Sequence, residues 1–573
     1  MDLNTEELKI LDGEKGRGRQ MAMSLLVDLG VAAKASRMIS IKSAHVSGVS
    51  PLTGGFGLIK FLEDITGDDE CKISIPTTLN AAGCDEDRIT EMNIPYENYL
   101  KKQREILECY EKLGIEMTMS CTPYEVEKKI ERGNASWAES NAICYANSYT
   151  DLRTNRESGL SALASAICGI TPEYGLLLDS NRSPNFCVNV ICELETPTDY
   201  SILGDWIGKN IPPEWDMPYG PIPCICGIKN DVDYYRRKAL TAAAANYGSP
   251  MLYLNCSEQN KEIDCCERKI IFSEKELNKR YAELAPKENV DLVVIGCPQA
   301  SYEEIRETEK LLRNNEIPDK RLWVFTSKRN YERAYEEGIV ESIEASGAMM
   351  LKNTCPEVVP YDRKKVKHIL TNSLKAEHYL TSGLNNIPTS VMRLKDCIEV
   401  AATPQKKIEK NVEPDVKIIE KNSNKKYRKG ACKIFGKGLK SQKEWNIEGE
   451  AMVTDVPITF LGYVNRETGK IEEEGHPLDG KTITDKILIF PKGSGSSVAP
   501  YVLMELFYRG KGPKAIVNSN LDQQMIPACS LLKIPYAHSF NYNPCYEINT
   551  RDMIKLELKN QNVELEVMER GDI

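Results

Sequence analysis

Short apolar runs alternate with helical patterns through much of the first 340 residues of the chain. Two of the strand patterns lie at 290–295 and 322–326, and each is followed by a helical pattern, at 302–313 and 328–337. Such alternation favours parallel strand pairing, with helices layered on the sheets. The sequence therefore predicts an α/β fold whose ligands bind beyond the carboxyl ends of the strands.

The same alternation is expected nearer the N-terminus. Helical patterns lie at 18–35, 56–64, 98–113, 136–149 and 159–168. Strand patterns lie between them at 38–42, 71–75 and 115–120, and each is followed by a polar loop. The carboxyl ends of parallel strands share one edge of a sheet, so these loops are candidates for a binding site.

A Gly/Ser loop joins a strand pattern to a helical pattern near the C-terminus. The apolar run 487–490 ends at Pro491, and the helical pattern after the loop places on one face Val502, Leu503, Leu506 and Phe507. Backbone N–H groups and the positive end of a helix converge in such a loop, which suits an anion. The Gly-Lys-Ser/Thr ending of a nucleotide-binding loop is absent, so a carboxylate is expected rather than a triphosphate. A flexible turn is the alternative.

The chain is expected to form two domains. Residues 405–429 contain few apolar residues and many Lys, Glu and Asn, which indicates a linker. A solvated strand or helix face is the alternative. We therefore predict a larger domain at 1–404 with mostly parallel sheets, and a smaller domain of short strands and helices at 430–573.

Charge and hydropathy limit the expected partners. The formal net charge of −10 argues against a nucleic-acid or anionic-membrane surface as the main partner. The first residues lack the basic and apolar regions of a signal peptide, and no apolar run is long enough to span a bilayer. We expect a soluble, cytoplasmic protein with a small-molecule substrate, no nucleic-acid partner and no membrane association.

Three of the nineteen cysteines share a context. Cys121, Cys297 and Cys355 each follow a strand pattern and stand one or two positions before a proline, which holds the side chain on a stiff turn. Three thiolates at one point match an iron–sulfur cluster with one iron left without a protein ligand. The alternative is three turn cysteines packed on a core.

The other cysteines are expected to be mostly core residues, because disulfide staples are not expected in a chain without a secretion signal. Two closer pairs could bind a metal, but neither has a second ligand pair at zinc-site spacing: Cys224/Cys226 and Cys265/Cys266.

Further polar residues indicate a lined pocket. His45 is expected on the loop 43–48, where an imidazole can serve as acid, base or hydrogen-bond donor, or can be structural. Lys375 and His378 share the segment 372–379. The polar run 137–148 leads to two arginines at 153 and 156, beside an apolar helix.

These residues carry a family resemblance. The chain resembles aconitase X, the divergent dehydratase branch of the aconitase superfamily, over nearly its whole length. The matching segments are 43–48, 76–83, 118–124, 137–141, 153–157, 171–175, 296–300, 353–356, 476–480 and 493–497. The resemblance implies a large catalytic part followed by a smaller swivelling domain. This chain resembles the fused form, so no separate small subunit is expected.

The resemblance also implies roles for individual residues. Cys121, Cys297 and Cys355 would bind the iron–sulfur cluster, with [4Fe–4S] expected and [2Fe–2S], [3Fe–4S] or a single iron as alternatives. Ser496 would remove the proton next to a carboxylate, and His45 would protonate the leaving hydroxyl. The residues expected to bind substrate are Thr78, Asn80, Arg153, Asn155, Arg156, Lys375 and Ser497.

Two positions depart from the family pattern. Position 494 is Ser where a basic residue is expected, and Val498 stands where aconitases proper carry Arg. These departures leave the identity of the carboxylate-binding residues open, though not the reaction class.

The implied reaction is removal of water from a hydroxy acid. Fusion of the two parts favours cis-3-hydroxy-L-proline as substrate, whereas the segment 43–48 looks closer to members that act on mevalonate 5-phosphate. An iron-sensing RNA-binding regulator is an alternative of another class, but the acidic chain has no large basic face to support it.

Overall fold

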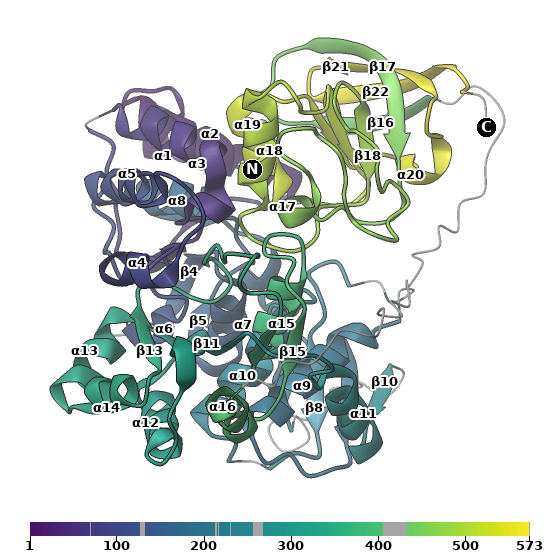
Figure 1. Ribbon diagram of the computed structural model, residues 1–573. Helices are drawn as coiled ribbons and strands as arrows, with labels where there is room; N and C mark the ends of the chain where they lie inside the picture. The colour runs from purple at the N-terminus through teal and green to yellow at the C-terminus, as the bar shows by residue number, and fades with distance from the viewer. Residues whose placement is uncertain are drawn as a thin grey trace.

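The computed structural model of the protein describes residues 1–68, 70–126, 132–212, 215, 217–229, 231–255, 268–404 and 433–571. A barrel formed by the C-terminal strands lies beside the N-terminal helices, and the sheets of the middle of the chain lie below them in the view of Figure 1. Within the described ranges, no helix is both long enough and apolar enough to cross a bilayer.

The N-terminal part is built on a small parallel sheet. Its strand order is β3 (Thr77–Leu79), β2 (Ser43–Val46), β4 (Gly133–Trp137) and β5 (Leu152–Arg153). All three pairings are parallel. The polar loops that follow β2 and β3 therefore leave the same edge of the sheet, as the sequence pattern predicts for a ligand site. A separate antiparallel pair joins β1 (Met38–Ser40) to β6 (Ile170–Pro172).

Two further parallel sheets follow along the chain. One has the order β10 (Lys269–Phe272), β7 (Phe186–Val190), β8 (Pro223–Cys226) and β9 (Tyr253–Leu254). The other has the order β13 (Met349–Lys352), β12 (Leu322–Thr326), β11 (Leu292–Ala300), β14 (Ile369–Thr371) and β15 (Thr389–Val391). The strands of the second of these sheets are almost entirely buried, as expected for a sheet covered on both faces, whereas β9 and β10 of the first are only partly buried.

The C-terminal part is a closed barrel. Its strand order is β16 (Lys433–Gly438), β20 (Tyr536–His538), β19 (Ala515–Asn518), β18 (Ile487–Phe490), β17 (Trp445–Val453), β21 (Met553–Lys559) and β22 (Asn562–Glu569). The strands β17 to β20 pair in parallel, and β16, β21 and β22 pair in antiparallel fashion. Apolar and polar residues alternate along β21 and β22, because one face of each strand is buried in the barrel.

Helices cover the sheets and join the domains. In the first part they are α1 (Thr5–Leu11), α2 (Arg17–Ala32), α3 (Pro51–Thr66), α4 (Ile89–Met92), α5 (Tyr99–Lys112), α6 (Pro123–Val126), α7 (Ser140–Tyr149) and α8 (Gly159–Cys168). The middle sheets carry α9 (Pro197–Lys209), α10 (Tyr234–Ala245), α11 (Glu274–Leu284), α12 (Tyr302–Leu312), α13 (Lys328–Glu336), α14 (Ile339–Ala345), α15 (Leu374–Thr381) and α16 (Leu394–Ala402). The barrel adds α17 (Phe460–Tyr463), α18 (Ala499–Tyr508), α19 (Met525–Leu532) and α20 (Pro544–Glu547).

The barrel packs against the N-terminal helices through α18 on α3 and α19 on α2. Buried residues of α2 and α19 belong to one continuous apolar core. At its edge the Asp28 carboxylate accepts hydrogen bonds from the Ser441 N–H (2.7 Å), the Ser441 hydroxyl (2.5 Å) and the Ser530 hydroxyl (2.5 Å). The Arg466 guanidinium pairs with Glu505 at 3.1 Å and donates to the Thr53 carbonyl at 2.7 Å. The interface therefore combines apolar packing with buried polar contacts.

Some local predictions differ from the structure. Residues 71–75 form no strand, because the N–H groups of Ile73 and Ser74 bond to two different segments, at Leu113 and Ala166. The loop expected at 76–80 instead contains β3, and 115–120 contributes a single bridge to Thr78. The helix expected at 136–149 begins only at Ser140, after β4. In each case the pairing of distant segments overrides the local pattern.

The strand–loop–helix near the C-terminus is confirmed as β18 and α18. Val502, Leu503 and Leu506 are fully buried as predicted, whereas Phe507 is 42% exposed and lies off the apolar face. The predicted linker 405–429 lies outside the described residues, so its conformation stays a prediction.

Candidate active site between the domains

The Gly/Ser loop between β18 and α18 docks on the N-terminal sheet. Gly495 has a φ of +89°, a conformation that glycine adopts at little cost. The Ser497 hydroxyl shares a hydrogen bond of 2.9 Å with the hydroxyl of Ser47, which follows β2. The Ser497 carbonyl accepts a bond of 3.0 Å from the N–H of Gly159. The loop thus reaches across the interface to the carboxyl edge of the first sheet.

Ser496 faces a cavity beside this contact. The Val498 N–H lies 3.5 Å from the Ser496 Oγ, and Val498 directly precedes α18. The N-terminus of a helix carries positive partial charge, which favours negative charge on a nearby oxygen. A Ser496 oxygen that becomes negative during a reaction would therefore be stabilised here.

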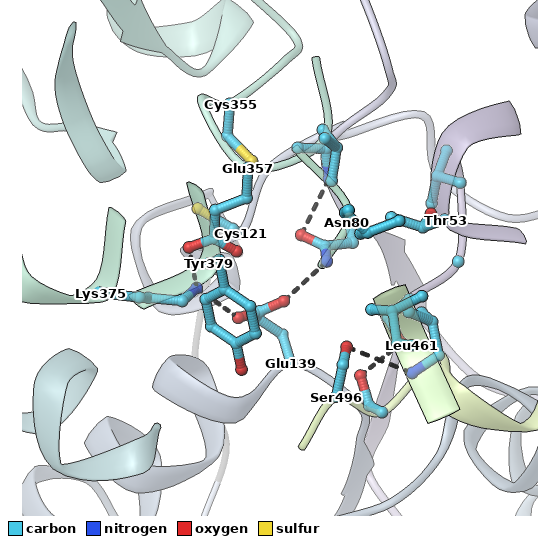
Figure 2. A pocket seen from close by; sticks show the side chains of 18 residues that line it. Thr53, Asn80, Cys121, Glu139, Cys355, Glu357, Lys375, Tyr379, Leu461 and Ser496 are labelled. Atoms are coloured by element: carbon cyan, nitrogen blue, oxygen red, sulfur yellow. Dashed lines mark hydrogen bonds and ion pairs between the residues drawn. The ribbon is translucent and has the colours of Figure 1, made fainter. Parts of the chain in front are cut away.

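Both domains line the cavity (Figure 2). Its volume is about 40 Å³, which holds no more than a few water molecules. One side in the picture carries Cys121, Cys355, Glu139, Glu357, Lys375 and Tyr379, and the other carries Thr53, Leu461 and Ser496, with Asn80 between them. The two domains therefore pack closely around this cavity.

The three cysteines singled out by the sequence lie at or next to the cavity and are buried. Cys121 and Cys355 line the cavity, and the Cys297 thiol donates a hydrogen bond of 2.9 Å to the cavity carboxyl of Glu357. Burial raises the pKa of Cys121 to about 12, and burial together with the nearby Glu357 carboxyl raises the pKa of Cys297 and of Cys355. As free thiols they are therefore protonated at neutral pH.

Three buried thiols beside one cavity have the donor chemistry that an iron–sulfur cluster or an iron ion requires. Within the described ranges, however, no three His, Cys, Asp or Glu side chains already stand in an arrangement that could hold a metal ion. The donor set fits the expected group in its chemistry, and all three thiols lie at or next to the cavity.

A buried lysine holds the two cavity carboxyl groups. Lys375 Nζ lies 2.8 Å from Glu139 Oε1 and 3.3 Å from Glu357 Oε1. It also lies 2.6 Å from the side-chain oxygen Oδ1 of Asn141. Burial alone would raise the pKa of both carboxyl groups. At Glu139 the attraction of the Lys375 ammonium outweighs burial, so the pKa of Glu139 is lowered. At Glu357 burial dominates and raises the pKa. Lys375 is thus neutralised by protein groups, and it lies on helix α15 rather than on the expected loop.

His45 lies deeper than the sequence suggests. It is on strand β2 rather than on a loop, and its Nδ1 lies 2.9 Å from the Thr78 hydroxyl. The Nε2 atom is buried without a hydrogen-bond partner among the described residues. Burial lowers the pKa of His45 to about 4, so the ring is neutral at pH 7. Asn80, by contrast, reaches the cavity and donates a bond of 2.8 Å to Glu139 Oε2.

Arg153, Asn155 and Arg156 lie in three different environments. Arg153 pairs with the exposed Asp179 at 2.6 Å, away from the cavity lining. The Asn155 side chain accepts from the Leu176 N–H and donates to a backbone carbonyl, so its amide is occupied. Arg156 is half-buried, and desolvation lowers its pKa against the opposing influence of Tyr379. Across the described residues, no carboxylate lies within 4.0 Å of the Arg156 guanidinium.

The other cysteine pairs lie elsewhere. Cys224 and Cys226 are on β8, with sulfur atoms 3.7 Å apart. Cys265 and Cys266 lie outside the described residues, so a metal-binding role for that pair stays untested.

Comparisons with known proteins agree with this architecture. Family models match the chain in three places: the aconitase X first domain at residues 1–180, the third domain at 290–403 and the swivel domain at 440–565. The phosphomevalonate dehydratase large subunit of Methanosarcina mazei is 36% identical over 407 residues, covering 70% of this chain and 97% of that subunit.

The chain belongs to the aconitase X family. Other relatives extend the comparison. The phosphomevalonate dehydratase small subunit of Pyrococcus horikoshii is 33% identical over 141 residues, 25% of this chain and 99% of that subunit. The cis-3-hydroxy-L-proline dehydratase of Pseudomonas aeruginosa is 27% identical over 420 residues, covering 70% of each chain. The crystal structure of Thermococcus kodakaraensis aconitase X in its holo form aligns with a TM-score of 0.62 at 34% identity, covering 70% of this chain and all of that one.

The family and its fold are thus as the sequence predicts. This aconitase X chain is a hydro-lyase, and its swivel domain is fused to the catalytic region.

Sequence reasoning missed several cavity residues of this aconitase X chain. Glu357 stands two positions after Cys355, and Ser47 stands two positions after His45, so both were adjacent to residues already singled out. Glu139 was part of a recognised polar run but received no role. Thr53 lies on α3 just before the helical pattern expected at 56–64, and Tyr379 ends the segment 372–379, which was singled out only for Lys375 and His378.

Proposed function

We propose that this dehydratase removes water from mevalonate 5-phosphate, with Ser496 as the base and with Cys121, Cys297 and Cys355 as iron ligands. The observation that carries the substrate choice is the 33–38% identity to phosphomevalonate dehydratase large subunits over 95–97% of their length, against 27% to the hydroxyproline enzymes. This reverses the preference for cis-3-hydroxy-L-proline that the fusion of the two domains suggests.

The charges around the cavity support a substrate with two anionic ends. Hydroxyproline carries an ammonium group that requires a carboxylate partner, but Glu139 and Glu357 are both engaged by Lys375. The Arg156 guanidinium, which lies outside the cavity lining, has no carboxylate within 4.0 Å among the described residues. A guanidinium binds phosphate oxygens in two-pronged fashion, so Arg156 suits the phosphate.

The other end of the substrate would lie at the Gly/Ser loop. Its carboxylate would be held by the N-terminus of α18 and by hydroxyls such as that of Ser497. The Ser496 oxygen would then remove a proton from the carbon next to the carboxylate, and the helix N-terminus would stabilise the negative oxygen. This geometry agrees with the role that the family resemblance implies for Ser496.

The hydroxyl would leave from the neighbouring carbon toward the side of the cavity that carries Cys121 and Cys355. Iron held by the three cysteines supplies a Lewis acid for the departing hydroxyl. His45 receives no proton-donating role in this proposal, because its ring is neutral and lies behind the Thr78 hydroxyl. Closure of the swivel domain would exclude water from the site.

Anaerobically prepared enzyme should be assayed with mevalonate 5-phosphate, mevalonate and cis-3-hydroxy-L-proline in parallel. We expect turnover of the first and a loss of at least tenfold in kcat/KM with mevalonate, since a charged phosphate contact is worth about 1.5–3 kcal/mol. Turnover of hydroxyproline without turnover of the phosphate ester would overturn the proposal.

A further inference from the structure

Gln299 stands at the centre of the three cysteine-bearing segments. It lies on β11, two positions after Cys297, and is fully buried. Its side-chain nitrogen lies 3.2 Å from the Met119 carbonyl, 2.9 Å from the Thr354 carbonyl and 3.2 Å from the Thr326 carbonyl. One amide therefore joins its own segment to the segments before Cys121 and before Cys355.

The same residue also contacts a cysteine directly. The Gln299 side-chain oxygen accepts a hydrogen bond of 3.3 Å from the Cys121 N–H, and the Gln299 backbone N–H points at the Cys121 sulfur at 3.3 Å. An N–H donor at a sulfur atom stabilises negative charge on it. This contact opposes the effect of burial, which raises the pKa of the free Cys121 thiol.

The three cysteine segments need such a connection, because each has an irregular backbone conformation just before its cysteine. Met119, Gly296 and Asn353 all have positive φ, at 42°, 103° and 66°. This conformation is costly for a bulky residue such as Met119, so surrounding contacts must hold it. The pairing of β11 with β12 also shifts register between Ile295 and Ala300.

Gln299 is itself anchored from behind. Its carbonyl accepts a hydrogen bond of 2.5 Å from the Lys238 ammonium, which is 2% exposed and pairs with Glu304 at 2.7 Å. The anchor comes from α10, an element that carries none of the three cysteines. The amide is thus fixed in space independently of the segments that it joins.

We propose that Gln299 is the positioning residue that holds Cys121, Cys297 and Cys355 in register for one iron centre. It does not line the cavity, so it acts through the cysteines and not on the substrate. The inference rests on the proposed assignment of the three cysteines to iron. A residue that orients metal ligands in this way typically accounts for about 10–100-fold in metal affinity.

The test compares the wild-type protein with Gln299→Glu and Gln299→Met. The carboxylate of the first variant has the shape of the amide but would face three carbonyl oxygens without a proton to donate. The second removes the polar group and keeps the length of the side chain. The matched control is Asn185→Asp, because the Asn185 amide joins two backbone segments, at Gly220 and Ile222, outside the cysteine region.

Two readouts are independent of turnover. Iron binding is measured by titrating ferrous iron, with and without sulfide, into anaerobic apoprotein and following the absorbance of the sulfur-to-iron bands. Alkylation of apoprotein by iodoacetamide, read by mass spectrometry, gives the rate at each cysteine. We expect both Gln299 variants to bind iron at least tenfold more weakly and to alkylate Cys121 and Cys355 at least fivefold faster, while Asn185→Asp matches the wild type in both readouts even if its Tm falls.

The outcomes separate the two proposals. Wild-type protein that binds no iron would remove the cysteine assignment, and the inference with it. Wild-type protein that binds iron, with unchanged affinity and spectrum in a folded Gln299→Met, would overturn the positioning role alone. If Gln299→Glu does not fold, the Gln299→Met result decides the question.

Discussion

The hydroxyls of Ser47 and Ser497 lie 2.9 Å apart, although 450 positions separate the two residues in the chain. This contact ties the Gly/Ser loop of the swivel domain to the end of β2 in the catalytic region. It also distinguishes two adjacent serines, because the Ser497 hydroxyl is engaged across the interface while that of Ser496 faces the cavity.

The first prediction follows from that difference. Ser496→Ala should lower kcat by about 10²–10⁴-fold with little change in KM, as expected for a group that acts in proton transfer. Ser497→Ala loses one hydrogen bond at the interface and should reduce kcat/KM by about tenfold or less. Steady-state kinetics on both variants, with Tm as a check on folding, would separate the roles. Near-full turnover by Ser496→Ala would move the base to another residue.

The second prediction concerns the metal ligands. Replacing any one of Cys121, Cys297 and Cys355 by Ser should abolish iron–sulfur absorbance and activity, because each is expected to supply one bond to the same centre. Cys168→Ser, at the end of α8 and outside the cavity lining, is the control and should keep both. Full iron content in any one of the three single variants would exclude that cysteine from the ligand set.

The third prediction tests the anion site. Arg156→Met should raise KM for mevalonate 5-phosphate by about 10–100-fold, because it removes a charged hydrogen bond to the phosphate. Arg153→Met should change KM by less than about threefold, since Arg153 pairs with an exposed carboxylate at the surface. A larger effect at Arg153 than at Arg156 would restore the role that the sequence suggests for Arg153.

The sequence was informative where one segment carries its own signal. The β18–α18 unit is recognisable because an apolar run, a Gly/Ser loop and a helical pattern follow one another without interruption. The cysteines were found in the same way, each before a proline. The resemblance then joined segments that no local pattern could have joined.

Other features depend on contacts between distant segments. Residues 77–79 form a strand only because β2 lies beside them, and local propensity does not contain that information. The same holds for Lys375, whose role depends on Glu139 and Glu357 from two other segments. Likewise, the two arginines at 153 and 156 look equivalent in the sequence, and only the fold shows that Arg153 is paired with Asp179 while Arg156 is half-buried and has no carboxylate within 4.0 Å among the described residues.

The fourth prediction is a dependence of stability on pH. Burial lowers the pKa of His45, His378 and His538 to about 4, against 6.5 in the unfolded chain. The unfolded state therefore binds more protons below pH 6.5, and each histidine's contribution to stability is lost as the pH falls from 6.5 toward 4. Between pH 7 and pH 5 this amounts to about 2 kcal/mol for each histidine.

His378→Gln gives a clean measurement, because His378 lies outside the cavity lining. Urea unfolding at pH 7 and pH 5 should show a loss of stability that is about 2 kcal/mol smaller in this variant than in the wild type. Equal losses in the two proteins would mean that His378 titrates normally in the folded state.

The last prediction concerns the two-domain architecture. Relatives carry the two parts as separate large and small subunits, and here the site lies between Ser496 in one part and the cysteines in the other. The covalent tie then mainly raises the effective concentration of one part at the other. Residues 1–404 and 430–573, produced as separate chains, should be inactive alone and regain activity on mixing, with a rate that depends on concentration.

Asp28→Ala should weaken this association of the two separate chains at least tenfold, because it leaves the Ser441 and Ser530 donors at the interface without their acceptor. Asp64→Ala, on the exposed surface of α3, should not weaken it. Turnover by the large fragment alone would place the whole reaction in the catalytic region and remove the need for the swivel domain's serine.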